Sequence, residues 1–121
     1  MRSAPERGQA TVEFALVLPV VVALLVGLVQ IGRVVGVQVA VIDAARAGAR
    51  AASVDPRPSV AEAGARDALA HGDRLEVRLD LVEGHPRFVA VTASETVHPF
   101  GPALTIRATS TMAVEAAADD P

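Results

Sequence analysis

The residue types that most often perform catalysis or bind metals are few in this sequence, and they are scattered. Its three histidines, His71, His85 and His98, fall at the end of an expected helix and in two turns next to proline. Cysteine is absent, and no serine motif, glycine-rich phosphate loop or metal-ligand spacing accompanies the histidines. We therefore predict no catalytic residues, no metal site, no cofactor and no small-molecule substrate.

The segment RGQATVEFALVLP, residues 7–19, carries the most informative motif. A basic leader ends at Gly8, and Glu13 and Phe14 follow at the start of a long apolar run. This order resembles the class III signal of type IV pilins, in which a prepilin peptidase cuts after the glycine on the cytoplasmic side. The resemblance implies cleavage between Gly8 and Gln9. It also implies that Glu13, the fifth residue of the mature chain, and Phe14 serve in peptidase recognition and assembly.

Glu13 stands where a charge needs a partner. A carboxylate at a membrane edge is costly to submerge unless a cation pairs with it. Cleavage would create such a cation, the amine of Gln9, one helical turn away in the same chain or in a neighbouring subunit. The alternative is that Glu13 lies in the headgroup layer, favourably placed near a helix N-terminus.

The apolar run from Phe14 to Gly32, FALVLPVVVALLVGLVQIG, has no ionisable side chain. Its length matches the roughly 20 residues that a helix needs to cross a hydrocarbon core of about 30 Å. Arg2 and Arg7 precede it and place the N-terminus in the cytoplasm by the positive-inside tendency. A secretory signal peptide is the alternative, but the acid directly before the run and the length of the run argue against it. We predict a single-pass span at about 14–32, with the C-terminal domain extracytoplasmic.

The helical pattern continues beyond the span, because the following segment is rich in alanine and has no proline before Pro56. One helix over residues 9–54 is expected, with half of it beyond the bilayer. Ala44, Gly48 and Ala52 fall four residues apart and form a ridge of small residues that permits close helix packing. Such a ridge suits the domain's own sheet or a partner helix.

The chain after the long helix predicts a small α+β domain over residues 55–115. The prolines of DPRP break the helix, and Ser59 with Glu62 forms a capping-box pattern for a second, short helix that runs to about His71. Apolar and polar residues then alternate in three strands, Leu75 to Leu81, Phe88 to Val97 and Leu104 to Val114. The expected fold is α+β and pilin-like: a long N-terminal transmembrane helix, a second short helix and a three-stranded antiparallel sheet. Residues 116–121 form an acidic tail.

Length and charge restrict the remaining classes of function. With 121 residues, part of them in the span, the chain has room for one small domain. Its formal net charge of -3 lacks the basic footprint of a protein that binds phosphate backbones. We therefore expect no nucleic acid partner.

Three segments are similar to the TadE-like family of pilin-related proteins from tight-adherence (Flp pilus) systems: RGQATVEFALVLPVV, ARAGARAAS at 45–53 and LTIRATSTMAVE at 104–115. The resemblance implies a minor pseudopilin of the bacterial cytoplasmic membrane, with residues 1–8 as a leader, that assembles or initiates Flp-type pili. The partners it implies are the membrane, a prepilin peptidase, other pilins or pseudopilins and tight-adherence assembly proteins. Major Flp pilins are much shorter and usually carry Tyr after the Glu, whereas this chain has Phe14 and a globular region. The alternative is an unprocessed, membrane-anchored extracytoplasmic binding or adhesion module.

Overall fold

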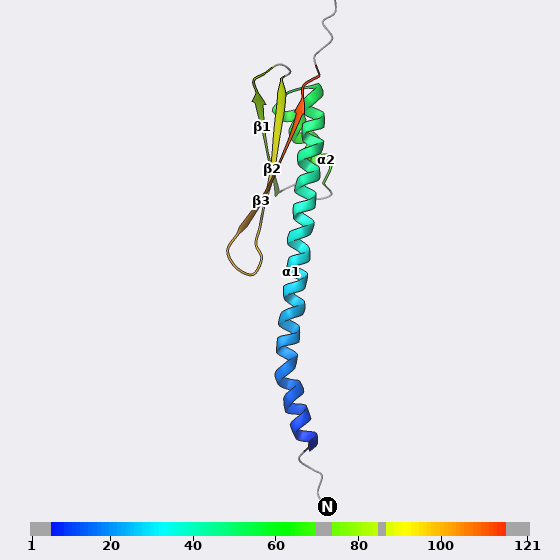
Figure 1. Ribbon diagram of the computed structural model, residues 1–121, viewed down its shortest axis with the longest axis vertical. Coiled ribbons are helices and arrows are strands. Elements are labelled where there is room, and N and C mark those ends of the chain that lie inside the picture. The colour runs from blue at the N-terminus through cyan, green and yellow to red at the C-terminus, as the bar shows by residue number, and fades with distance from the viewer. Residues whose placement is uncertain (1–5, 70–73, 85–86, 116–121) are drawn as a thin grey trace, which may run out of the picture. The chain divides into compact units, whose positions relative to one another are not determined.

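The structure is a computed structural model that describes residues 6–69, 74–84 and 87–115. Its elements, shown in Figure 1, are α1 (Glu6–Val54), α2 (Pro58–Asp67), β1 (Leu75–Val82), β2 (Phe88–Val97) and β3 (Leu104–Ala113). The predicted α+β class, with a long helix, a short helix and a three-stranded antiparallel sheet, is confirmed. The predictions for residues 1–5, His71, His85 and the tail at 116–121 fall outside the described residues.

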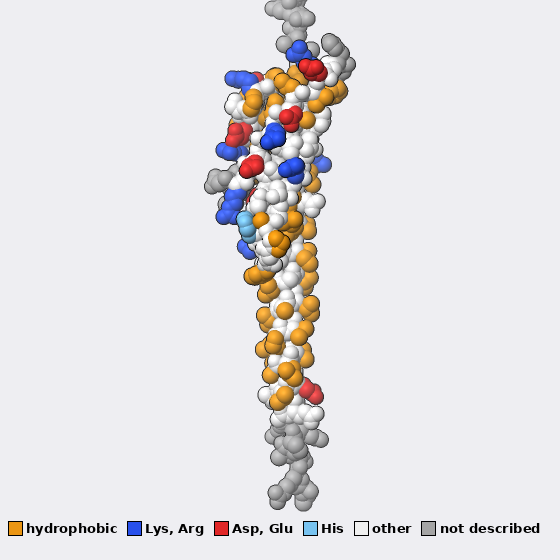
Figure 2. Space-filling model, turned by 90° about the vertical axis from the view of Figure 1, so that its left-hand side faces the viewer, with side chains coloured by type: hydrophobic (Ala, Val, Ile, Leu, Met, Phe, Trp, Pro, Cys, Tyr) orange, Lys and Arg blue, Asp and Glu red, His pale blue; other side chains and the backbone are white. Residues whose placement is uncertain are grey.

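The chain divides into two compact units, one that ends at Arg33 and one that begins at Val34. The N-terminal unit contains the first part of α1, whose large apolar side chains are exposed, Phe14 at 67% and Leu24 at 65%. Figure 2 shows apolar side chains along this stretch of the helix. Pro19 lies inside α1 without ending it. This helix is long and apolar enough to cross a membrane, and hydrocarbon is the surrounding that suits such a surface.

The C-terminal unit is a two-layer arrangement of helices on a sheet. The sheet has the order β1-β2-β3, and both strand pairs are antiparallel. The register sets Leu79 opposite Val91, and Val91 opposite Ser110. Because side chains alternate along a strand, one face of the sheet collects the apolar residues and packs against α1 and α2.

Small side chains dominate the contact between the helices and the sheet. The largest fully buried side chains of the described residues are only valines, Val41, Val89 and Val91. Alanines of both helices fill most of the remaining contact and leave little space between backbones. Two clusters of buried residues result, Val41, Ala44, Ala45, Ala65, Leu75 and Ala93 in one and Ala49, Ala52, Ala61, Val89 and Val91 in the other.

The end of α1 is tied to the end of β3 by the backbone. The N–H of Glu115 donates to the carbonyl of Ser53 over 2.9 Å. The last carbonyls of a helix have no partner within it, so this bond satisfies one of them. The C-terminal ends of α1 and β1 lie at one end of this unit, and the β2–β3 connection lies at the other (Figure 1).

The predicted capping box of Ser59 and Glu62 at the start of the second helix is wrong. Arg57 is the N-cap, no side-chain hydrogen bond caps the helix, and Pro58 stands in its first turn. Proline is preorganised for the first helical position, so the helix begins one residue before Ser59 and needs no capping box there. Glu62 instead pairs with Arg66, one turn further on, over 2.6 Å.

The predicted end of this helix near His71 is also wrong. α2 ends at Asp67, and Ala68 is its C-cap. The N–H of Leu69 donates to the carbonyl of Arg66 over 3.0 Å, which is the tighter three-residue spacing typical of a helix end.

Leu81 departs from the predicted buried face of the first strand, since it is 59% exposed. Its register partner Val89 is fully buried. The helical layer is interrupted here, because α1 ends at Val54 and α2 begins at Pro58. Leu81 therefore lines an open hollow of about 590 Å³ together with Pro56, Val82, Glu83, Gly84, Arg87 and Val114.

Two neighbouring residues of β2 provide a test of which face of the sheet is buried against the helices. Val91→Thr places a hydroxyl in the fully buried core, and we expect it to lower the free energy of unfolding by about 1–3 kcal/mol. Thr92→Val, on the opposite face, removes only a hydroxyl contact with Thr109 and should change it by less than about 1 kcal/mol. Hydrogen exchange of the β2 amides in detergent micelles measures both. Equal effects of the two substitutions would contradict the assigned faces.

Candidate functional site

The residues predicted for cleavage and recognition lie on the first turns of α1. Gly8, Gln9, Glu13 and Phe14 are all exposed. A Cβ atom added at Gly8 would meet nothing within 4 Å, so no part of the described structure covers the bond between Gly8 and Gln9. This bond is helical, because α1 begins at Glu6. Unwinding of the first turn of α1 is enough to make the backbone at Gly8 and Gln9 extended. Helix ends unwind at small free-energy cost.

Gln9 and Glu13 are four residues apart on α1 and are therefore neighbours on one helix face. In the uncut chain the nitrogen of Gln9 belongs to a peptide bond and carries no charge. A cut after Gly8 would turn it into an ammonium group about four residues, roughly 6 Å along the helix axis, from the backbone of Glu13. The helix thus provides the spacing, while the ion pair itself stays a prediction.

The ridge of small residues on α1 is occupied by the domain's own elements. Ala44, Gly48 and Ala52 are all buried. A Cβ atom added at Gly48 would lie 2.9 Å from the carbonyl oxygen of Ala61 and 3.0 Å from Cγ1 of Val91. Gly48 is therefore wedged between α2 and β2, where a side chain has no room.

Gly64 of α2 is the residue that meets this ridge, and the sequence reasoning missed it. A Cβ atom added there would lie 2.7 Å from the Cβ of Ala51 and 3.6 Å from the Cα of Gly48. The two helices thus cross backbone against backbone at a pair of glycines. Small residues at 61, 64 and 65 were the available signal, since they repeat on α2 the pattern that marks the ridge on α1.

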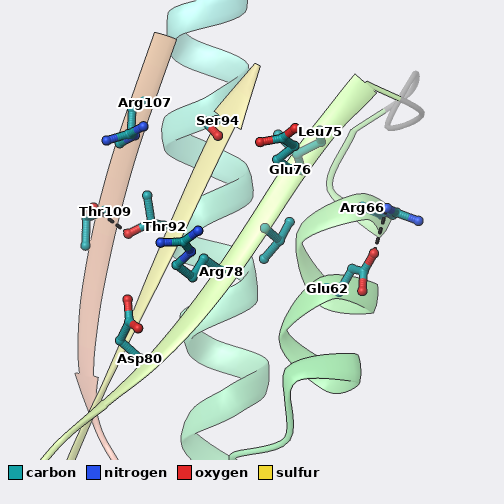
Figure 3. Close-up of a pocket in the computed structure, with 11 residues that line it drawn as sticks. Glu62, Arg66, Leu75, Glu76, Arg78, Asp80, Thr92, Ser94, Arg107 and Thr109 are labelled. Atoms are coloured by element: carbon teal, nitrogen blue, oxygen red, sulfur yellow. Dashed lines mark hydrogen bonds and ion pairs between the residues drawn. The ribbon is translucent and has the colours of Figure 1, made fainter. Parts of the chain in front are cut away.

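The outer face of the sheet is polar and hollowed. The hollow, of about 670 Å³, is lined by residues of all three strands and by Glu62 and Arg66 of α2. Figure 3 shows Thr92 and Thr109 on adjacent strands, with hydroxyl oxygens 2.8 Å apart. Charges of both signs surround them, Arg78 and Arg107 with Glu76 and Asp80. Within the described residues no three His, Cys, Asp or Glu side chains are grouped to hold a metal ion.

The link between the helices contains an exposed ion pair, between Arg57 and Asp55. The Nε of Arg57 donates to the carboxylate of Asp55 at 2.8 Å from each oxygen. This hydrogen bond lowers the pKa of Asp55 below its ordinary value. Exposed pairs of this kind stabilise a fold weakly, so its role is to shape the link.

A family model described as TadE-like protein matches residues 8–50. The match begins at Gly8, includes Glu13 and Phe14, and ends at the exposed Arg50, after two of the three ridge residues. It covers about a third of the chain, all of it in α1. Neither a curated protein nor a solved structure matches the chain. The family resemblance drawn from the sequence is confirmed.

The helix crossing yields a stability prediction. Gly48→Ala forces a methyl group against the Ala61 carbonyl, and overpacking of this kind costs about 1–3 kcal/mol. Alanine regains about 1 kcal/mol of helix propensity, so we expect a net loss of about 0–2 kcal/mol in place of the gain of about 1 kcal/mol that an open site would give. Gly36→Ala is the matched control, because a Cβ there meets nothing within 4 Å and the propensity gain acts alone. Hydrogen exchange of the β2 amides reports both; a Gly48→Ala protein as stable as Gly36→Ala would refute the close crossing.

Proposed function

We propose that the chain, whose residues 8–50 match the TadE-like family model, is a minor pseudopilin that acts in the assembly or initiation of Flp-type (tight-adherence) pili. We propose four parts for it: a leader over 1–8, a helix over 9–54 with its span at about 14–32, an extracytoplasmic domain over 55–115, and an acidic tail. The second half of the helix packs as part of the compact unit that begins at Val34.

One observation carries this proposal. The family match starts at Gly8, the residue after which the prepilin peptidase is expected to cut, and Glu13 stands directly before the exposed apolar stretch of α1. An unprocessed anchor needs neither a small residue at the end of its leader nor an acid at the edge of the hydrocarbon. Both features have a use if the leader is removed and the mature helix packs among other helices.

The chemistry of assembly then rests on charge neutralisation at the membrane edge. A buried carboxylate is costly without a cation, and an attraction between opposite charges strengthens as the surroundings become less polar. In the mature chain the amine of Gln9 and the carboxylate of Glu13 stand near one end of the same apolar helix. Pairing the amine of one subunit with the carboxylate of the next would set the axial register between them.

The partners proposed for this step are the membrane, a prepilin peptidase, other pilins or pseudopilins and tight-adherence assembly proteins. The N-terminus is proposed to be cytoplasmic, because the peptidase acts on that side and Arg2 and Arg7 lie in the leader. An unprocessed extracytoplasmic binding or adhesion module is the alternative, and cleavage distinguishes the two.

Processing is the first test. When the chain is co-expressed with a prepilin peptidase, we expect intact mass to show loss of residues 1–8 and a mature chain that begins at Gln9. Gly8→Leu should reduce the cut fraction by at least about tenfold, since the peptidase must hold the residue before the scissile bond closely. The uncut precursor should stay inserted, because the span is unchanged. Normal processing of Gly8→Leu, or a chain that keeps Arg2 in the presence of the peptidase, would favour the unprocessed module.

The role of Glu13 is tested by Glu13→Gln, which keeps the size of the side chain and removes its charge. We expect membrane insertion to survive, because a neutral amide is cheaper to bury than a carboxylate. Crosslinking to other pilus components should fall by about tenfold or more, which corresponds to a loss of roughly 1.4 kcal/mol.

Only the cut species, resolved by mass, should be scored, so that slow processing does not obscure the result. Wild-type crosslinking and surface pili in the Gln variant would reduce Glu13 to an acid of the headgroup layer.

A further inference from the structure

The connection between β2 and β3, His98–Ala103 with the sequence HPFGPA, presents an aromatic ring to its surroundings. Phe100 is 83% exposed, more than any other large hydrophobic residue that the structure describes. The core, the small-residue ridge and the proposed processing site make no use of it. Burial of this ring against an apolar surface would be favourable.

The backbone of this connection holds the ring outward. Pro99 and Pro102 restrict the chain on either side of Phe100. Gly101 has a φ of 145°, a conformation that residues with a side chain rarely adopt. The two prolines restrict the backbone beside Phe100, which lowers the conformational entropy lost when the tip meets a surface.

Packing places this tip at the end of the C-terminal unit where α1 enters it. Val37 of α1 and Ile106 of β3 pack against the same buried cluster. From Val37 back to Val34 the helix covers about 4.5 Å, at about 1.5 Å per residue. From Ile106 to Leu104 the strand covers about 7 Å, at about 3.4 Å per residue, and the connection continues beyond it. The tip thus extends at least as far as Val34, the residue at which the unit begins.

The side chains near the tip suit a bilayer surface. Between Glu95 and Arg107 the chain has no Asp, Glu, Lys or Arg. Leu104, at the start of β3, adds a second exposed apolar side chain. Arg33 directly precedes the unit and is a cation of the kind that lipid phosphates attract. Apolar groups with a basic neighbour are the composition of segments that lie in the membrane interface.

We propose that the β2–β3 connection rests on the bilayer surface from which α1 emerges, with the ring of Phe100 in the boundary between headgroups and acyl chains. This inference rests on the proposed membrane anchor, since it is the span that brings the tip to lipid. Tethering makes the contact intramolecular, so a single ring suffices where it would not recruit a free protein. The contact would hold the domain in one orientation on the membrane before a partner subunit engages it.

Labelling of the full-length chain in vesicles tests the proposal. The chain has no cysteine, so each Cys variant carries a single nitroxide label. Ala103→Cys reports the tip, Ala113→Cys reports an exposed alanine at the other end of β3, and Leu24→Cys reports the span. In phosphatidylethanolamine and phosphatidylglycerol vesicles, we expect the label at 103 to be at least about fivefold less accessible to a water-soluble nickel chelate than the label at 113.

Two further substitutions identify the ring as the cause. In the Ala103→Cys protein, Phe100→Ser should raise nickel access to the level seen at 113. Val54→Ser is the matched control, since Val54 is 71% exposed but stands at the opposite end of the unit, and it should change nothing. Phe100 is too exposed for its loss to unfold the sheet, and hydrogen exchange of β2 verifies this.

The span label separates failure of the inference from failure of the anchor. If the label at 24 is in lipid but the labels at 103 and 113 are equally accessible to the nickel chelate, the surface contact is overturned and the anchor stays intact. A label at 24 that the nickel chelate reaches overturns the anchor, and the inference with it. Protection at 103 that is lost on dilution of the protein with excess lipid would assign the tip to a second copy and also overturn the proposal.

Discussion

The crossing of α1 and α2 at Gly48 and Gly64 is the contact on which the C-terminal unit depends. Because neither glycine has a side chain, the two backbones lie close together. A methyl group added at Gly48 would collide with the carbonyl oxygen of Ala61. That approach brings the alanines of both helices within reach of the sheet, whose largest fully buried side chains are valines. A core of such small residues can exclude water only if the helices and the sheet lie close together.

A second constraint is that one continuous helix has to suit two surroundings. Around residues 14–32 its apolar side chains are exposed on all sides, which suits hydrocarbon and no aqueous surface. From Val41 onward the helix face that packs against the sheet consists mainly of alanine and glycine, while Asp43, Arg46 and Arg50 remain exposed. A partner helix can approach the first stretch freely, but on the second stretch the small-residue ridge is already covered by α2 and β2. The N-terminal part of α1, which begins near Glu13, is therefore the part whose apolar surface the described residues leave uncovered.

Much of the fold follows from local patterns, and the exceptions have physical causes. Alternation placed all three strands, because a half-buried strand needs apolar residues at every second position. The capping box at Ser59 failed because a proline one residue earlier already supplies the first helical turn. Leu81 fits the alternation but is exposed, since no helix covers that corner of the sheet.

The sequence by itself determined the features that depend on one stretch of chain: the apolar run, the basic residues before Gly8, the acid at position 13 and the similarity of residues 8–50 to the TadE-like family. Hydrophobicity and short motifs are read along the chain and need no knowledge of what packs against them. Only the tertiary structure decided that Gly64 meets Gly48, and that the tip carrying Phe100 lies at the end where α1 enters the domain. Those outcomes depend on which distant surfaces meet. A ridge of small residues is equally suited to a sheet, a neighbouring helix of the same chain or another subunit, so its neighbour is settled only when the whole domain packs.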